Sequence, residues 1–129
     1  MYIHLFKFNP LLLNIYSAAD SGFTVAEYEV GLAYSKGRGV SIDVDKSLEW
    51  MQKSADQGYL RAIEGCGIVY RNRNDHKKAF KYLKFAVDRG VATAQSEIGS
   101  MYQYGTGIKK SSCLAKRYFR MCSENFNYT

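Results

Sequence analysis

The chain has 129 residues, which suits one domain, and carries 18 Lys and Arg against 12 Asp and Glu, a formal charge of +6. This balance favours acidic partners and permits contact with nucleic acid or anionic lipid without requiring either. No run approaches the ~20 apolar residues of a membrane-spanning helix, and the single proline, Pro10, is compatible with a helical chain.

The start of the chain has two interpretations. Lys7, a run of leucines and then small residues follow the order of a cleaved signal peptide. Shifting residues 46–58 back by 36 positions, however, places Ser-Ala-Asp-Gln-Gly on Ala-Ala-Asp-Ser-Gly at 18–22. We therefore predict that Pro10–Asp20 is the second helix of a preceding half-repeat, with residues 1–9 as a lead-in.

Three pairs of helices are expected after this half-repeat. The first helix of each pair is predicted at Thr24–Lys36, Leu60–Asn72 and Ala92–Tyr104. The second helix is predicted at Val44–Gln57, His76–Arg89 and Ser112–Glu124. A polar residue that can cap backbone N–H groups precedes each second helix, namely Asp43, Asp75 and Ser111.

Four columns of residues recur together, with steps of 36 and then 32 residues. They hold glycine at 22, 58 and 90, alanine at 26, 62 and 94, glycine at 31, 67 and 99, and tyrosine at 34, 70 and 102. The second step is shorter because repeat 2 lacks the G-x-G loop of repeats 1 and 3. The small residues should let helices approach closely, while aligned large residues, among them Met51, Leu83 and Phe119, fill the seams. A period of this length predicts a solenoid of stacked helix pairs.

These residues also carry a family resemblance. The pattern G-x-x-x-A-x-x-x-x-G-x-x-Y-x-x-G-x-G-V, followed by K-x-x-x-W and A-x-x-G, resembles the Sel1-like repeat, a relative of the tetratricopeptide repeat. The resemblance covers roughly Pro10 to Ser123. It implies an all-α, right-handed superhelix of about three helix pairs plus an N-terminal half-repeat helix. The single domain, 1–129, is expected to divide into a half-repeat (10–22), three repeats (23–58, 59–90, 91–124) and two tails (1–9, 125–129).

Residues arranged for catalysis are almost absent. The two histidines, His4 and His76, stand apart from any nucleophile motif, and no metal-ligand spacing occurs. The glycine loops GRG and GTG lack the preceding strand and the Lys-Ser signature of a phosphate-binding loop. We predict no enzymatic activity, no cofactor and no metal site.

The three cysteines, Cys66, Cys113 and Cys122, have no regular spacing, which indicates reduced thiols and a cytoplasmic protein more than a secreted one. Cys66 and Cys122 align with apolar or small columns and are expected to be buried. Cys113 aligns with polar positions and is expected to be exposed. It is either an incidental surface residue or a reactive thiol, favoured by nearby Lys109 and Lys110.

The resemblance implies a non-catalytic scaffold or adaptor that binds another protein or peptide in a concave groove lined by the first helix of each repeat. The net charge makes a partner of acidic character one option. The positions transferred by alignment are Val25, Tyr28, Leu32, Ser35, Arg61, Glu64, Ile68, Arg71, Asn72, Ser96, Ser100, Gln103 and Tyr104. Apolar residues in repeat 1 give way to polar ones in repeat 3, which suits an extended peptide or a partner's helix.

Two further possibilities stay open. The first concerns a run of basic residues in repeat 2. It could form a solvated helix face, meet an acidic segment of a partner, or bind nucleic acid or an anionic surface. The run comprises Arg71, Arg73, His76, Lys77, Lys78, Lys81, Lys84 and Arg89.

The second concerns the end of the array. An array that opens on a second helix leaves an apolar helix face at its end. We therefore expect either homo-oligomers formed end to end or a longer parent chain.

Overall fold

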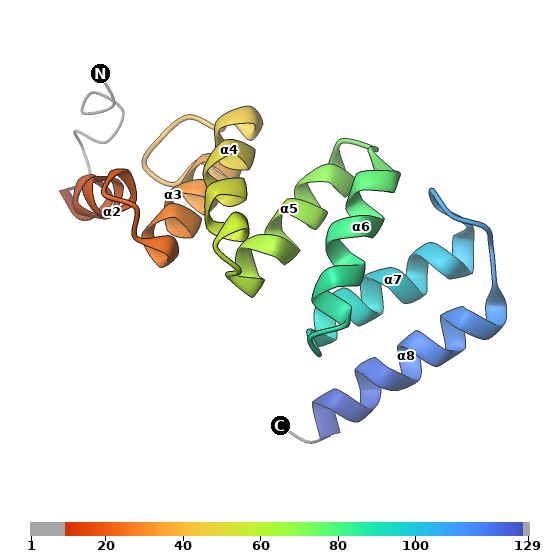
Figure 1. The fold of residues 1–129 in the computed structure, drawn as a ribbon. Helices are drawn as coiled ribbons and strands as arrows, with labels where there is room; N and C mark the ends of the chain where they lie inside the picture. Colours follow the sequence, from red (N-terminus) through yellow and green to blue (C-terminus); the bar gives the residue numbers. More distant parts are fainter. Residues whose placement is uncertain (1–9, 128–129) are drawn as a thin grey trace. The chain divides into compact units, whose positions relative to one another are not determined.

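The computed structural model describes residues 10–127, and side chains within residues 14–124. This part contains seven α-helices and no strand (Figure 1). In chain order they are α2 (Pro10–Asp20), α3 (Thr24–Lys36), α4 (Val44–Asp56), α5 (Leu60–Asn72), α6 (His76–Val87), α7 (Ala92–Tyr104) and α8 (Ser112–Asn127). The predicted bounds of α2 and of the three first helices are confirmed. The predicted lead-in, residues 1–9, lies outside the described residues.

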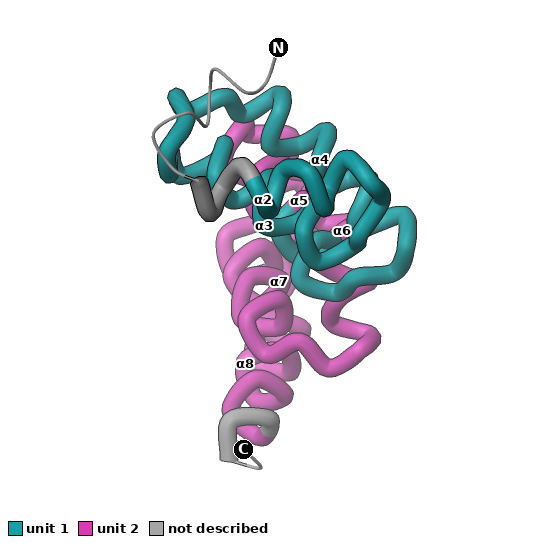
Figure 2. The backbone as a smooth tube through the Cα atoms, turned by 90° about the vertical axis from the view of Figure 1, so that its left-hand side faces the viewer, with its two compact units in different colours: residues 1–65 teal, residues 66–129 magenta. Residues whose placement is uncertain are grey.

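The chain divides into two compact units (Figure 2). Unit 1 comprises residues 1–65 and unit 2 comprises residues 66–129, so that the boundary falls inside α5. Each unit contains at least one helix pair joined through buried side chains, and each has its own core.

The three predicted capping residues are confirmed as N-caps of the second helices. Asp43 Oδ1 accepts a hydrogen bond from the N–H of the third residue of α4 at 3.1 Å, and Asp75 Oδ1 accepts the equivalent bond in α6 at 3.3 Å. In α8, Ser111 Oγ accepts from the corresponding N–H at 3.2 Å. Each cap satisfies one of the N–H groups that a helix start leaves without an intrahelical partner.

The loops between paired helices differ in length but close in the same way. The backbone N–H of each capping residue donates to the carbonyl of the aligned tyrosine, in the pairs Asp43–Tyr34 (3.0 Å), Asp75–Tyr70 (2.9 Å) and Ser111–Tyr102 (2.9 Å). In the short loop of repeat 2, Asn74 adopts a φ of 63°, in the left-handed region that asparagine tolerates better than most residues. The four residues missing from this loop therefore leave its two ends joined as in the other repeats.

Unit 1 has its core where α2, α3 and α4 meet. Its buried cluster includes Tyr34 (1% exposed) and Trp50 (7% exposed), and Tyr16 of α2 meets the Trp50 ring edge-on at 5.6 Å between centroids. Gly31 of α3 faces Met51 of α4 so closely that a Cβ at Gly31 would lie 2.6 Å from Met51 Cγ. The absence of a side chain at Gly31 is therefore what lets α3 and α4 approach each other this closely.

The same kind of contact, between a glycine of a first helix and a large side chain of the paired second helix, occurs twice in unit 2. A Cβ at Gly67 of α5 would lie 2.8 Å from Leu83 Cγ on α6, and one at Gly99 of α7 would lie 2.8 Å from Phe119 Cε1 on α8. The aligned tyrosines stack beside these contacts, in the pairs Tyr70–Tyr82 and Tyr102–Tyr118, both 5.5 Å apart. The glycine column and the Met-Leu-Phe column thus form a single recurring seam.

A pair of alanine substitutions tests this seam in unit 1. Gly31→Ala is expected to lower the free energy of unfolding by about 1–3 kcal/mol, because the new methyl meets Met51 Cγ and the Ser47 carbonyl oxygen, 3.1 Å away. Gly65→Ala meets the movable sulfur of Met51 at 2.9 Å, and alanine favours helix, so we expect a change of at most about 1 kcal/mol, in either direction. Urea unfolding followed by circular dichroism measures both. Equal effects would show that the seam does not depend on glycine.

Candidate protein-binding surface

None of the thirteen residues predicted to line the binding surface is buried. In unit 1, Val25 is 54% exposed and Arg61 is also exposed, while Tyr28, Leu32, Ser35 and Glu64 are partly buried. In unit 2, Asn72, Gln103 and Tyr104 are exposed, and Ile68, Arg71, Ser96 and Ser100 are partly buried. The neighbouring helix positions that form the seams are buried, so each first helix has one packed side and one side open to solvent.

Tyr28 is the predicted residue of unit 1 with a defined aromatic contact. Its ring meets that of Tyr59 edge-on, with centroids 5.4 Å apart, and a Cβ at Gly65 would lie 3.7 Å from Tyr28 Cε1. Burial, reinforced by Glu29, raises the pKa of the Tyr28 phenol, and the nearby Arg61 guanidinium opposes this. The phenol is therefore protonated at neutral pH. Glu64 adds to the rise in the Tyr28 pKa.

A hydrogen-bonded network holds the first turn of α3 in place, just before Tyr28 in the sequence. Glu27 is only 4% exposed, and its Oε1 accepts a hydrogen bond from Gln57 Nε2 at 2.5 Å. Thr24 Oγ1 donates to Gln57 Oε1 at 2.5 Å, and Ser54 Oγ donates to the Thr24 carbonyl at 2.8 Å. Because the buried carboxylate and the amide are both satisfied, the network fixes the end of α4 to the turn that carries Tyr28.

In unit 2, an ion pair joins two first helices. Arg71 of α5 pairs through Nη1 with Glu97 Oε2 of α7, and both side chains are about one-third exposed. Arg71 Nη2 also donates to Asn72 Oδ1 at 3.4 Å. The predicted site residue Arg71 is therefore positioned by an acidic partner, and its charge is already compensated. A ligand would have to share this guanidinium with Glu97.

Sequence reasoning did not include Tyr59 or Glu97 in the surface. Tyr59 occupies the position just before a first helix, aligned with Phe23 and Val91, so an apolar or aromatic column was visible there. Glu97 stands 26 residues after Arg71, and no local spacing signals a pair that distant.

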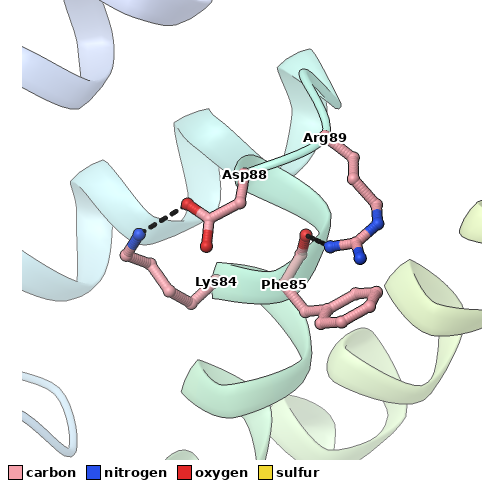
Figure 3. Close-up of polar contacts among 4 residues, drawn as sticks. All are labelled: Lys84, Phe85, Asp88 and Arg89. Carbon is pink, nitrogen blue, oxygen red and sulfur yellow. Dashed lines mark hydrogen bonds and ion pairs between the residues drawn. The ribbon is translucent and has the colours of Figure 1, made fainter.

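The predicted basic face of α6 is only partly available to a ligand. Lys84 Nζ bonds to Asp88 Oδ1 at 2.7 Å, which raises the pKa of Lys84 (Figure 3). Arg89 lies over the Phe85 ring at 3.4 Å from the centroid and donates to the Phe85 carbonyl (Figure 3). Lys77, Lys78 and Lys81 are exposed. Lys78 Nζ, however, lies 3.9 Å from the carboxylate of the cap Asp75 and 5.4 Å from the centroid of the Tyr70 ring.

The cysteines form no disulfide within the described residues. The predicted burial of Cys66 and exposure of Cys113 are confirmed, whereas Cys122, expected to be buried, is only partly buried.

Across residues 14–124 no group of three His, Cys, Asp or Glu side chains is placed to hold a metal ion. In the same part of the chain, no helix has the length and apolar character to cross a membrane.

Comparisons with known proteins agree with this architecture. The chain is 35% identical over 95 residues to the ERAD-associated E3 ubiquitin-protein ligase component HRD3B of Arabidopsis thaliana, an alignment that covers 71% of this chain but 15% of HRD3B. It spans between 15% and 21% of the length of three curated relatives that it matches, HRD3B among them.

Two solved structures share the fold. One is c5321, a protective antigen of uropathogenic Escherichia coli with an SLR fold (TM-score 0.81, 29% identity, 88% of this chain and 25% of that chain). The other is a Sel1 repeat protein from Oxalobacter formigenes (TM-score 0.71, 29% identity, 88% of both chains). The fold is therefore an all-α repeat solenoid. The Sel1 repeat family model matches residues 24–59, 66–91 and 92–124, and the chain belongs to the Sel1 repeat family.

Proposed function

We propose that this chain is a non-catalytic scaffold or adaptor that binds another protein through the open sides of its first helices. Sel1-repeat proteins are generally scaffolds for contacts between proteins. The observation that carries the proposal here is the division of each first helix, in which the glycine at 31, 67 or 99 is buried while none of the thirteen variable positions is. The continuous groove across all three repeats stays a prediction.

The unit 1 surface offers the chemistry of a binding hot spot. Tyr28 presents a large ring held edge-on by Tyr59, and Arg61, whose charge lowers the pKa of Tyr28, is exposed on α5. Tyrosine and arginine are enriched among residues that dominate binding energy, because they combine apolar area with directed hydrogen bonds. A ring that is already held loses little freedom on binding. A partner's extended segment or helix would meet this surface with apolar and acidic groups.

The test begins with a partner identified by affinity capture and then purified. We expect the Tyr28→Ala/Arg71→Ala double variant to weaken its affinity for the full chain at least about tenfold, because each truncation removes an anchor of the hot-spot type. The control is Glu49→Ala/Asp56→Ala, which alters two exposed residues of α4 and should leave the affinity within about twofold. If the α4 variant loses binding while the Tyr28/Arg71 variant keeps it, the partner uses another surface.

One observation favours the alternative function, binding of nucleic acid or an anionic surface. Unit 2 holds 12 Lys and Arg against 4 Asp and Glu, a formal charge of +8, whereas unit 1 holds 6 against 8, a formal charge of −2. Such asymmetry is typical of chains that meet polyanions. Contact with a nucleic acid would weaken steeply with salt.

A further inference from the structure

Unit 2 has a hollow at the loop between α7 and α8. It is open to solvent, has a volume of about 460 Å³ and is lined by apolar side chains from three helices and the loop, namely Phe80, Tyr102, Leu114 and Ile108. Lys109 and Lys110 form its rim, and both are exposed. None of these six residues belongs to the surface proposed above.

The floor of the hollow is held in place by contacts around Tyr102. Phe80 meets the Tyr102 ring edge-on, with centroids 5.9 Å apart and ring planes at 90°. Tyr118 stacks on the same ring at 5.5 Å. The Tyr102 carbonyl accepts the Ser111 N–H at 2.9 Å, which closes the loop beneath the lysines. The site is therefore preformed, and a ligand would lose little free energy in ordering it.

In repeats 1 and 2, a lysine side chain lies over the tyrosine ring that corresponds to Tyr102. Lys46 Nζ lies over the Tyr34 ring at 5.7 Å, and Lys78 Nζ lies over the Tyr70 ring at 5.4 Å. The aligned residue in repeat 3 is Leu114. Tyr34 and Tyr70 are buried, whereas Tyr102 is partly exposed. Repeat 3 thus lacks the lysine that covers the tyrosine elsewhere.

In the loop between the paired helices, repeat 3 has lysines where repeat 1 has uncharged residues. Repeat 1 has Ser41 and Ile42 where repeat 3 has Lys109 and Lys110. Val40, the loop residue before them, is buried at 9% exposure, but the aligned Ile108 is only partly buried. Repeat 3 has therefore gained an apolar floor and a cationic rim, a combination that repeats 1 and 2 do not have.

The charges around the hollow indicate the chemistry of its ligand. The ion pairs of the described residues in unit 2 involve neither Lys109 nor Lys110, and unit 2 as a whole carries a formal charge of +8. An apolar floor attracts one large apolar side chain, and two rim cations without counter-charges attract carboxylates on either side of it. The two requirements are met together by an acidic segment with a single aliphatic anchor.

We propose that this hollow binds a short acidic segment of a partner protein, with one aliphatic side chain on the Phe80–Tyr102–Leu114 floor and flanking carboxylates at Lys109 and Lys110. The proposal extends the proposed scaffold function by a second site and rests on it for the class of partner. It does not depend on Tyr28 or Arg71.

The test uses the full chain and three labelled hexapeptides, followed by fluorescence anisotropy at about 0.15 M salt. The first peptide has one leucine among aspartates and glutamates, the second replaces this leucine with serine, and the third replaces the acids with lysines. We expect the first to bind with a Kd below about 1 mM and the second at least about fivefold more weakly, because it lacks the apolar anchor. The third should not bind.

Variants then locate the site. Leu114→Ser removes the aliphatic side chain from the floor without changing the charge, and Lys109→Glu/Lys110→Glu reverses the rim; each should weaken binding of the leucine peptide at least about tenfold. The control, Lys116→Glu/Arg117→Glu, makes the same change of net charge at exposed positions of α8 and should cost less than about threefold. Circular dichroism confirms that every variant is folded.

Each contrary outcome overturns the proposal. Equal loss in the rim variant and the α8 control would mean general charge attraction, and equal binding of the leucine and serine peptides would mean that the floor is not used. Tighter binding of a labelled single-stranded 20-mer oligonucleotide, lost in the rim variant, would assign the rim to nucleic acid instead. Tyr28→Ala/Arg71→Ala should keep the peptide affinity, so failure here and failure of the proposed scaffold surface can be told apart.

Discussion

Replacing Leu83 with alanine is expected to lower the free energy of unfolding by about 2–5 kcal/mol. Leu83 is completely buried, and it occupies the recurring seam opposite Gly67, where a Cβ would be only 2.8 Å from its Cγ. Because glycine has no side chain that could move into the space, the cavity left by Leu83→Ala would stay largely open. Urea unfolding followed by circular dichroism at 222 nm measures the loss.

The same chemical change at a less buried leucine is the control. Leu114→Ala removes the same atoms from a residue that is partly exposed in the α7–α8 hollow, so we expect a loss of at most about 1–2 kcal/mol. If Leu83→Ala cost no more than Leu114→Ala, the packing of Leu83 against Gly67 would not be what stabilises the α5–α6 seam.

The second large effect is expected at Gly107, in the α7–α8 loop. Its φ of 72° is in the left-handed region, and a Cβ there would lie 2.4 Å from His76 Cβ and 3.1 Å from the His76 carbonyl carbon. The contact includes backbone, which a change of rotamer cannot relieve. We therefore expect Gly107→Ala to lower the free energy of unfolding by about 2–4 kcal/mol, from backbone strain and overpacking together.

Gly90→Ala separates these two contributions. Gly90 has a φ of 83°, but no heavy atom lies within 4 Å of the point where an alanine Cβ would stand, so its replacement introduces strain without a clash. We expect a loss of about 1 kcal/mol, measured by the same urea unfolding. A Gly107→Ala loss equal to that of Gly90→Ala would show that the loop can move away from His76 at no cost.

Much of the fold could be predicted because each repeat marks its own helices. The capping residues fix where the second helices begin, and all three starts are confirmed. The predicted ends of the second helices are less accurate. Val87 ends α6 two residues before the predicted end, Asp56 ends α4 one residue early, and α8 continues to Asn127, into the predicted tail. No glycine follows α8 within the sequence, so nothing local signalled where it would end.

The candidate site was less accessible to sequence reasoning. Exposure of the first-helix positions follows from their place beside the buried columns, but the Arg71–Glu97 pair joins residues on two helices and has no local pattern. The hollow draws on three helices and a loop, and its volume depends on side-chain placement. One signal did exist. Leu114 is the apolar member of a column whose other members are Lys46 and Lys78.

The shared closing bond between each capping residue and its tyrosine has a consequence for how such repeats diversify. The bond lengths are 2.9–3.0 Å whether or not the G-x-G segment is present. Residues between the two anchors can therefore be gained, lost or exchanged while the flanking helices keep their pairing. Exposed positions of these segments, other than a glycine fixed by its backbone conformation such as Gly107, can therefore change their chemistry at little energetic cost, and the paired lysines of the last repeat occupy such positions.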